Sequence, residues 1–337
     1  MVIVNGHSII SPLGEGSQAN FEAVHAGRSG LRLYTDRFAD VEPFCASLFD
    51  TPQDFVELCV RSVELALDKR PRTNYQLPMS KDTVFILSTT KGDDLDLLRP
   101  AQAIARHFGN PNQPIVVSNA CTSGVCAQIT AMRLLEAGVY RHAVVVGCDL
   151  QSRFIVSGFQ AFKALSPEPC LPFSPERKGL NLGEAAATII FSRQPSAFSS
   201  QPVWTLEAGA IHNDANHISA PSRTGEGAYL CLKDVLQGVS PSDIDLLGVH
   251  GTATLYNDDM EKAAIERAGL QDIPVSALKP FFGHTMGAAG VLETILCMMQ
   301  MENGKWKMDN GQLQIIKMLS GFGGVNAAIR MKLKIQN

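Results

Sequence analysis

Short apolar segments alternate with helical patterns along most of the chain, and this alternation limits the choice of fold more than any other feature. Segments such as TVFIL at 83–87 show no polar alternation, so they predict strands that are buried on both faces of a sheet. We expect such strands at 83–87, 115–117, 143–146 and 188–191, and further strands at 2–10, 203–207, 246–249, 274–276 and 328–333. A helix is expected to begin at Thr51-Pro52, with the threonine as its N-cap. The alternation predicts an α/β fold without a dividing linker.

The composition argues against several classes of protein. The 337 residues carry a formal net charge of −4, which disfavours a basic surface for nucleic acid. No apolar run approaches the ~18 residues that a membrane-spanning helix requires, and the opening MVIVNGHSIISPLG lacks the basic stretch and long apolar core of a signal peptide. The eight cysteines form no CxxC pair and no Cys/His cluster with zinc spacing. We therefore expect a cytoplasmic protein with reduced thiols, no metal site, and no nucleic-acid or membrane partner.

Cys121 stands where a predicted strand meets the helical pattern of SNACTSGVCAQITAMRLLEAG, residues 118–138. A helix beginning directly after the cysteine would aim free backbone N–H groups and the positive end of its dipole at the sulfur, which favours the thiolate. Small neighbours such as Ala120 and Gly124 would let a substrate approach. This segment alone leaves two interpretations open: a buried structural cysteine, or an exposed, activated nucleophile.

Two histidines also follow predicted strands directly. His250 opens HGTAT after the strand at 246–249, and His284 lies in KPFFGHTMGAAG after the strand at 274–276. The carboxyl ends of strands are where open α/β sheets usually bear their sites. A single histidine there is more often structural, but two histidines together with Cys121 at a third strand end indicate one shared cleft.

The segment around His284 weakly repeats the layout of the segment around Cys121. Both NACTSGVCAQITAMRLLEAG and GHTMGAAGVLETILCMMQMENG place a reactive residue before a small-residue stretch and a helical pattern that ends near glycine. Either the chain contains a duplication, or two helix starts are similar by chance.

Six motifs in order resemble those of the β-ketoacyl synthases, the thiolase-fold condensing enzymes of fatty-acid and polyketide synthesis. They are SPLG at 11–14 with AGRSG at 26–30, NACTSG at 119–124, PFSPERKGLNLGEAAA at 172–187, HGTAT at 250–254, KPFFGHTMGAAG at 279–290 and GFGGVNAA at 321–328. No single motif is decisive, but six in the family's order are specific, and the match runs nearly end to end.

The resemblance implies a thiolase-like α/β fold with two similar βαβαβαββ halves in a five-layered αβαβα arrangement. The N-terminal half would be residues 1–192 and carry Cys121, and the C-terminal half would be residues 203–337 and carry His250 and His284. The two halves would share one core, and their similarity would explain the repeated layout.

The resemblance also implies a reaction, the decarboxylative Claisen condensation that yields a 3-ketoacyl thioester. Cys121 would receive an acyl group from the phosphopantetheine of an acyl carrier protein. His250 and His284 would hold the thioester oxygen of malonyl-carrier protein while decarboxylation forms an enolate, and backbone N–H groups of Cys121 and Phe322 would form an oxyanion hole. No metal or redox cofactor is implied, because the carbanion comes from decarboxylation.

Further residues match supporting positions of the family. Lys279 and Glu293 lie at the family's offsets from His284, where the two groups pair and support the histidine site. Thr252 and Thr254 match threonines that bind the pantetheine arm, although both could be ordinary turn threonines.

Three other side chains have both a functional and a structural interpretation. Asp258 and Glu261 are expected to support the site, or simply to cap a helix. Phe322, flanked by glycines, could act as a gate over the cysteine or be an ordinary core residue. For Glu184 we favour a buried structural carboxylate.

Other classes of thiolase-fold enzyme fit the motifs less well. Degradative thiolases carry a second cysteine where this chain has Phe322, and initiating or plant-type synthases use asparagine where it has His284. The elongating Cys-His-His class therefore fits better. The main alternative is a catalytically weak, synthase-like partner subunit of the chain-length-factor type, although such subunits usually lack the cysteine. A carrier-binding module without chemistry is a further alternative.

The chain departs from typical elongating synthases in length. The regions at about 34–80 and 303–320 are compressed, which is compatible with a specialised synthase that needs a partner and is similar to synthases of bacterial aryl-polyene clusters. The family is dimeric through the strand before the nucleophile, here Ile115–Val117. We therefore expect a homodimer, or a heterodimer with a related subunit.

Overall fold

One large mixed sheet organises the computed structural model, which describes residues 1–68, 77–193, 202–303 and 312–334. The strand order in this 11-stranded sheet is β12-β11-β13-β14-β10-β1-β9-β7-β5-β6, with the short β2 (Gly14–Glu15) paired to β1. The strands on one side of its centre are β1 (Val2–Ser11), β9 (Ala185–Arg193), β7 (His142–Asp149), β5 (Thr83–Ser88) and β6 (Ile115–Val117). Those on the other side are β10 (Val203–Asn213), β14 (Val325–Lys334), β13 (Gln312–Gly321), β11 (Leu246–Gly248) and β12 (Val275–Ser276).

The two sides of the sheet repeat one topology. From β1 outward, two antiparallel pairings are followed by two parallel ones, and the same succession runs outward from β10. The sides join where β1 and β10 pair antiparallel. The predicted boundary between the halves, after residue 192 and before 203, falls around residues 194–201, which lie outside the described residues.

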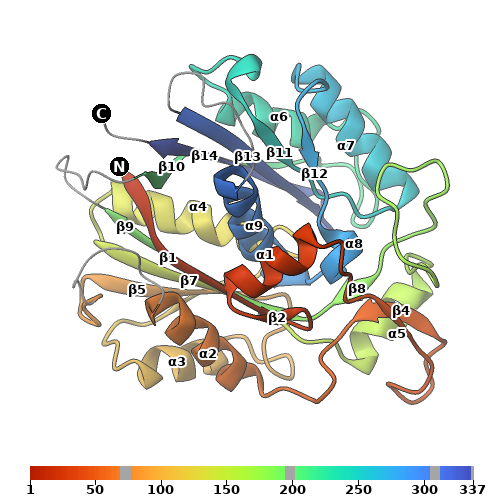
Figure 1. The fold of residues 1–337 in the computed structure, drawn as a ribbon, viewed down its shortest axis with the longest axis horizontal. Coiled ribbons are helices and arrows are strands. Elements are labelled where there is room, and N and C mark those ends of the chain that lie inside the picture. Colours follow the sequence, from red (N-terminus) through yellow and green to blue (C-terminus); the bar gives the residue numbers. More distant parts are fainter. Residues whose placement is uncertain (69–76, 194–201, 304–311, 335–337) are drawn as a thin grey trace.

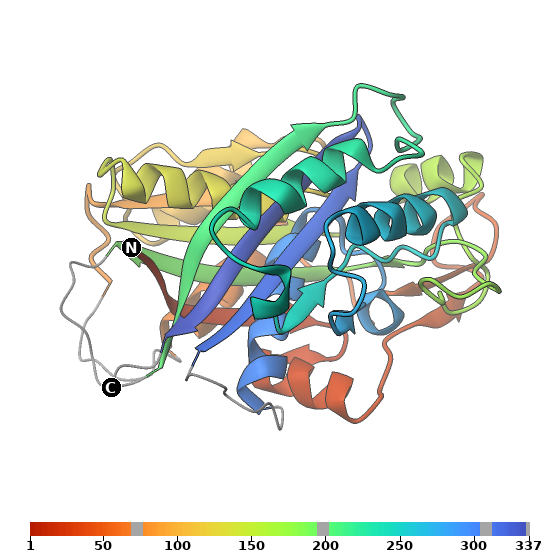
Figure 2. The same cartoon turned by 90° about the horizontal axis from the view of Figure 1, so that it is seen from above.

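Three layers of helices enclose the two sides of the sheet (Figure 1). Helices α4 (Ser123–Glu136) and α9 (Ala289–Asn303) lie between them. The outer helices are α2 (Phe55–Asp68) and α3 (Leu98–His107) on one side, and α6 (Glu226–Val235) and α7 (Leu255–Arg267) on the other. Figure 2, seen from above, shows α6 and α7 on the near face. Each helix layer has its own apolar cluster against the strands. The five-layered, thiolase-like arrangement is therefore confirmed.

The remaining elements lie around this stack. They are α1 (Ser17–His25), α5 (Arg153–Ala161), α8 (Lys279–Phe282) and a small sheet of β3 (Arg32–Tyr34), β4 (Phe44–Ser47) and β8 (Leu182–Gly183). Within the described residues, no helix is both long enough and apolar enough to cross a membrane.

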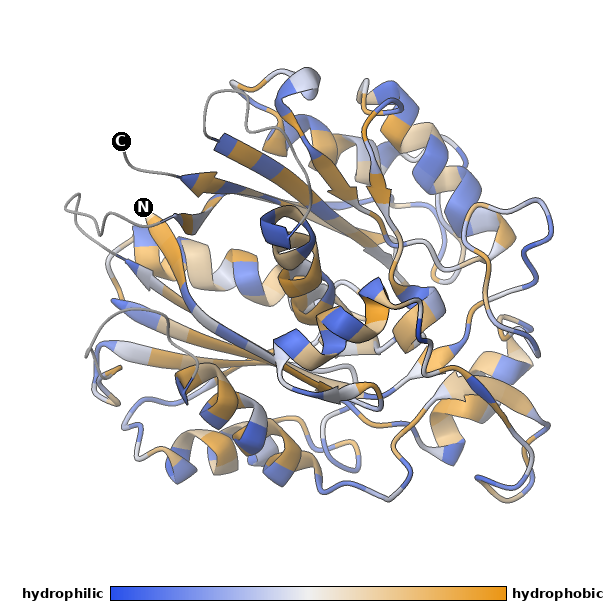
Figure 3. Ribbon diagram, viewed as in Figure 1, coloured by the Kyte–Doolittle hydropathy of each residue, from blue (hydrophilic) through white to orange (hydrophobic). Residues whose placement is uncertain are grey.

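The apolar segments of the sequence form the buried parts of the sheet. All residues of β5 and β7 are buried, as the absence of polar alternation predicts. The central α9 is apolar on almost every side because other layers surround it, whereas the outer helices keep polar faces (Figure 3). Strand β6 differs from the prediction, since it is the outermost strand and its residues are only half-buried.

One expectation about secondary structure was wrong, and one central strand was not expected. The helix predicted from Thr51-Pro52 begins at Phe55, because Asp54 Oδ1 accepts the N–H of Glu57 at 2.8 Å and so caps the helix. Strand β13 was not predicted at all, although it lies at the centre of the second side of the sheet. Part of the compressed regions, residues 69–76 and 304–311, lies outside the described residues.

Helices α4 and α9 cross at two glycines. A Cβ atom at Gly124 would lie only 2.8 Å from the Cα of Gly290, so the backbones touch at this point. Cys121 comes just before α4 and His284 just before α9. The close crossing therefore brings the starts of both helices to one place.

Candidate active site

A strained turn presents Cys121 between β6 and α4. The preceding Ala120 has φ of 47°, in the left-handed region that alanine rarely adopts. Side-chain hydrogen bonds hold the turn: Thr122 Oγ1 donates to Asn119 O at 2.7 Å, and Ser123 Oγ donates to Ala120 O at 2.6 Å. The turn places the sulfur at the helix start, as the sequence predicted.

The thiol is neither exposed nor intrinsically activated, which corrects the expectation from local sequence. Cys121 is 7% exposed, and burial raises its pKa to about 11. Lys279 and the backbone N–H groups of Phe322 and Cys121 lower this pKa, but burial outweighs them. Both N–H groups therefore lie next to the sulfur.

Buried charged groups hold the backbone of His250 just beyond β11. Glu261 of α7 accepts the N–H of Gly251 at 2.8 Å and also that of His250. On the other side, Lys279 Nζ donates to the carbonyl of His250 at 2.6 Å. Burial raises the pKa of Glu261 to about 7. Glu261 therefore supports the His250 turn and does not cap its own helix.

His284 is held by the loop that precedes β8. Its backbone N–H donates to Asn181 O at 2.6 Å, and the N–H of Gly183 donates back to His284 O at 3.0 Å. Three residues further on, the N–H of Gly287 donates to the buried Asp149 at 2.7 Å. Neither Asn181 nor Asp149 was recognised from sequence, because their role depends on contacts between distant segments.

The three predicted reactive side chains meet at one point. One ligand atom from each of Cys121, His250 and His284 lies within 4.8 Å of the other two. They line a cavity of about 380 Å³ that also includes Phe322 and Thr252. Three ring nitrogens have no hydrogen-bond partner among the described residues: Nδ1 of His250, and Nδ1 and Nε2 of His284. Buried polar atoms usually have partners, so these atoms point to a polar ligand.

Both imidazoles are held in the neutral form. Burial, followed by the charge of Lys279, lowers the pKa of His250 and of His284 well below the ordinary value. Lys317 lowers both pKa values further. A neutral imidazole carries one N–H, so each ring can donate one hydrogen bond into the cavity.

The predicted pair of Lys279 and Glu293 lies behind the histidines rather than in the cavity. Lys279 is fully buried, and its Nζ donates to Glu293 Oε1 at 2.9 Å. A second ammonium group, that of Lys317, lies 2.6 Å from Glu293 Oε2. Lys317 was missed from sequence; the only signal was a lysine inside the apolar segment LQIIKML.

Thr252 and Thr254 lie at the mouth of the cavity. Their hydroxyl groups are 2.9 Å apart, and both residues line the cavity with Cys121. Asp258 supports this loop: its carboxylate accepts the N–H of Ala253 at 3.2 Å and that of Phe173 at 2.7 Å. Like Glu261, it reaches back to the loop rather than capping α7.

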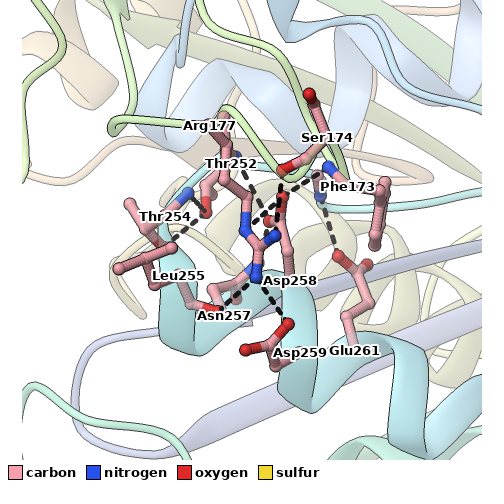
Figure 4. A network of polar contacts seen from close by, with 12 residues as sticks. Phe173, Ser174, Arg177, Thr252, Thr254, Leu255, Asn257, Asp258, Asp259 and Glu261 are labelled. Atoms are coloured by element: carbon pink, nitrogen blue, oxygen red, sulfur yellow. Dashed lines mark hydrogen bonds and ion pairs between the residues drawn. The ribbon is translucent and has the colours of Figure 1, made fainter.

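Arg177 links the segment between α5 and β8 to α7 beside these threonines (Figure 4). Its guanidinium donates to the carbonyls of Ser174 at 2.9 Å and Leu255 at 3.2 Å, and pairs with Asp259 at 2.5 Å. This contact fixes one wall of the cavity mouth.

Phe322 lies over the cavity in an aromatic cluster. Its ring stacks on Phe159 of α5 with centroids 5.9 Å apart, and tilts against Phe162 at 5.7 Å. It is 39% exposed, so it is not an ordinary core residue. The adjacent Gly321 lets the loop approach Cys121, because a Cβ there would lie 3.2 Å from the Cys121 nitrogen. Glu184 lies elsewhere as a structural carboxylate that accepts two backbone N–H groups.

The donor set of Cys121, His250 and His284 has the composition of a metal site. The neighbouring charge fits an anion better, because the ammonium groups of Lys279 and Lys317 raise the electrostatic cost of placing a cation there.

More than half of the chain matches models of one family. Residues 100–197 match the β-ketoacyl synthase N-terminal domain, and residues 205–309 match the β-ketoacyl synthase C-terminal domain.

Curated relatives carry names from the same family. The chain is similar to Nodulation protein E of Rhizobium leguminosarum bv. trifolii (33% identical over 196 residues) and to 3-oxoacyl-[acyl-carrier-protein] synthase 2 of Rhizobium meliloti (35% over 214 residues). These matches cover 56% and 59% of this chain but 48% and 50% of the relatives, so the chain spans about half the length of these relatives. A 3-oxoacyl-[acyl-carrier-protein] synthase 2 of Vibrio cholerae is 26% identical over 89% of this chain and 86% of its own.

Solved structures share the fold. A ketosynthase in complex with its chain length factor from Xenorhabdus doucetiae superimposes with a TM-score of 0.85 at 22% identity, over 99% of this chain and 98% of that chain. A β-ketoacyl synthase from Burkholderia phymatum gives a TM-score of 0.82 at 20% identity, over 100% and 99% of the two chains. Together with the matched domain models, the motifs and the layered fold lead to one assignment: the chain belongs to the β-ketoacyl synthase family.

Proposed function

We propose that this chain condenses an acyl thioester on Cys121 with malonyl-acyl-carrier protein, giving 3-ketoacyl-acyl-carrier protein, in fatty-acid, polyketide or aryl-polyene-type synthesis. The observation that carries the proposal is the convergence of one thiol with two neutral imidazoles in a cavity of about 380 Å³. A nucleophile, two hydrogen-bond donors and two backbone N–H groups are the parts that this reaction requires.

In the first step the acyl group moves from the carrier to Cys121. The sulfur attacks the thioester carbonyl, the bond from the acyl carbon to the pantetheine sulfur breaks, and the thiol proton goes to the departing pantetheine sulfur. The exchange therefore consumes no net proton, and a thiol with a raised pKa can take part once it transfers its proton. The N–H groups of Cys121 and Phe322 would stabilise the tetrahedral oxyanion.

In the second step the malonyl thioester loses carbon dioxide. The bond between its carboxylate and α-carbon breaks, and the electron pair forms an enolate whose oxygen accepts hydrogen bonds from His250 and His284. The α-carbon then attacks the acyl carbonyl, the bond to the Cys121 sulfur breaks, and the released thiolate takes up one proton from solvent to restore the thiol. Neutral imidazoles suit this role, because each carries one N–H donor without an acidic second proton.

The proposal includes an acyl carrier protein that delivers both substrates on phosphopantetheine. Thr252 and Thr254, at the cavity mouth, would hydrogen-bond the pantetheine arm, and Phe322 would act as a gate between the arm and the acyl group. Lys279, Glu293, Asp258 and Glu261 would position the histidines and the mouth rather than touch substrate. No other cofactor is needed in this scheme.

We also propose a dimer, with an identical chain or a related synthase-like subunit, in a reducing compartment such as the cytoplasm. The half-buried apolar strand β6 at the edge of the sheet supports a dimer, since it offers unpaired backbone on one side. The eight free cysteines support a reducing compartment.

The test is mass spectrometry of the intact protein after incubation with an acyl-carrier thioester and malonyl-carrier protein. The expected results are an acyl adduct on Cys121 and a 3-ketoacyl carrier product two carbons longer. Cys121→Ala should abolish both, while Cys126→Ala, which removes a buried thiol one helical turn away, should preserve both. Condensation by the Cys121→Ala variant would overturn the nucleophile assignment. The absence of any adduct across carriers would favour the chain-length-factor-type partner subunit.

A further inference from the structure

Lys317 is a buried ammonium group that the proposed reaction does not use directly. It lies on β13, is 1% exposed, and is flanked along the strand by the buried apolar residues Ile316 and Met318. Its Nζ donates to Val249 O at 2.6 Å and lies 2.6 Å from Glu293 Oε2. Burying a lysine is costly, so its charge needs an explanation.

The cluster of Lys279, Glu293 and Lys317 carries one positive charge in excess. Each carboxylate oxygen of Glu293 faces one ammonium group, Lys279 at 2.9 Å and Lys317 at 2.6 Å. Burial would raise the pKa of Glu293, but the two lysines outweigh it and lower this pKa, so the carboxylate stays charged. One negative charge therefore faces two positive charges.

The two lysines also donate hydrogen bonds to consecutive backbone carbonyls behind the histidine pair. Lys317 binds the carbonyl of Val249, and Lys279 binds the carbonyl of His250. The excess charge is thus fixed directly behind the peptide that presents His250 to the cavity.

Other acidic groups lie near this cluster but accept hydrogen bonds from other donors, and of these Glu261 also interacts with the charge of Lys317. Asp149 of β7 accepts hydrogen bonds from Thr89, Thr90 and Gly287. On α7, Asp258 and Glu261 accept backbone N–H groups, and burial raises the pKa of both carboxyls. The charge of Lys279 or Lys317 also acts on the two imidazoles and on the buried thiols of Cys121, Cys170 and Cys297.

We infer that Lys317 supplies a buried positive charge that makes the cavity select an anionic group, such as the carboxylate of a malonyl-type thioester, over a neutral acyl thioester. Lys317 is a positioning and specificity-determining residue, since it acts through Glu293 and the His250 peptide. The link to malonyl thioesters rests on the proposed function, whereas the preference for anions follows from the charge cluster alone.

The test compares alkylation of Cys121 by iodoacetate, an anion, and iodoacetamide, its neutral analogue. The same thiolate attacks the carbon of either reagent and displaces iodide, so a change in the thiol pKa cancels in the ratio of the two rates. Rates are measured by peptide mass spectrometry on the full chain. Lys317→Met should lower the iodoacetate-to-iodoacetamide ratio about threefold to tenfold, and Glu293→Gln, which removes the negative charge, should raise it.

Two further variants separate the effect of charge on this ratio from the effect of a disturbed structure. Lys317→Arg keeps the charge and should keep the ratio, and Lys262→Met removes an exposed lysine of α7 and should leave the ratio unchanged. If Lys317→Met does not fold, Glu293→Gln and Lys317→Arg still test whether the buried charge sets the ratio of the two alkylation rates.

An unchanged ratio in both charge variants, or a change in the same direction in both, would overturn the inference. The result is independent of condensation. A chain that condenses but shows no charge effect refutes the inference alone, and a chain that shows the charge effect without condensing refutes the proposed function alone.

Discussion

The imidazole rings of His250 and His284 meet edge to face, with ring centroids 5.2 Å apart and an angle of 80° between their planes. One ring follows β11 and the other follows α8, so segments from separate βα units supply the pair. Both rings are almost fully buried, both line the cavity, and three of their four nitrogens have no hydrogen-bond partner among the described residues. Two buried bases side by side disfavour protonation of either, which makes the pair a neutral donor site.

This burial predicts that the protein loses stability in mild acid. The folded-state pKa of each histidine is depressed, so below pH 6.5 the unfolded chain binds protons that the native state does not. Each histidine should therefore lower the free energy of unfolding as pH falls, by at most about 1.4 kcal/mol per pH unit, while Glu261, whose pKa is raised to about 7, offsets part of this loss. Urea unfolding at pH 7.5, 6.5 and 5.5 measures this slope. His284→Gln should reduce it, while His25→Gln, at an exposed position, should not; equal slopes in all three proteins would contradict the prediction.

Alkylation of Cys121 should show a thiol that is protonated at neutral pH. Because burial raises its pKa to about 11, the rate with iodoacetamide should rise about tenfold per pH unit from pH 7 to 9, without levelling off. Free cysteine, with a pKa of about 8.5, serves as the comparison and should begin to level off in this range. A plateau for Cys121 below pH 8 would mean that the thiol is activated in the resting protein.

His284→Ala should separate the two proposed half-reactions. In the proposed reaction, acyl loading uses Cys121 and the backbone N–H groups, whereas decarboxylation uses the imidazole donors. We therefore expect condensation to fall about 100-fold or more, with a much smaller loss of loading. Single-turnover acylation and product formation are measured on the same samples, with His212→Ala as the control outside the cavity lining. Equal losses in both steps would remove the assigned role of His284.

The sequence predicts the strands best where burial is uniform. Strands β5 and β7 are apolar throughout, and their burial in the sheet follows directly from that pattern. The apolar segment of β13 contains Lys317, and from sequence alone a lysine is expected to be exposed to solvent. Its partner Glu293 comes from α9, so only tertiary structure reveals that Lys317 is buried.

The convergence of the three candidate residues could be predicted, but the state of the thiol could not. Motif order identified Cys121, His250 and His284, and the structure brings them together. Local reasoning about the start of α4 predicted a lowered thiol pKa. Burial beneath the loop that carries Phe322, a contact across 200 residues of sequence, reverses the direction.

The glycine crossing of α4 and α9 should be the point where a single methyl group disturbs both stability and chemistry. In Gly290→Ala the new Cβ would clash with the backbone nitrogen of Val125, which cannot rotate away as a side chain can. The helices must then separate, at a cost of about 1–3 kcal/mol in the free energy of unfolding. Since Cys121 precedes α4 and His284 precedes α9, the same shift should lower condensation in protein that remains folded.

The matched control is Gly158→Ala in α5, where a Cβ would meet no atom within 4 Å. That change should stabilise the protein by about 0.5–1 kcal/mol. Chemical unfolding and condensation assays on both variants test the argument, and a Gly290→Ala protein as stable and active as wild type would show that the helices do not depend on this contact.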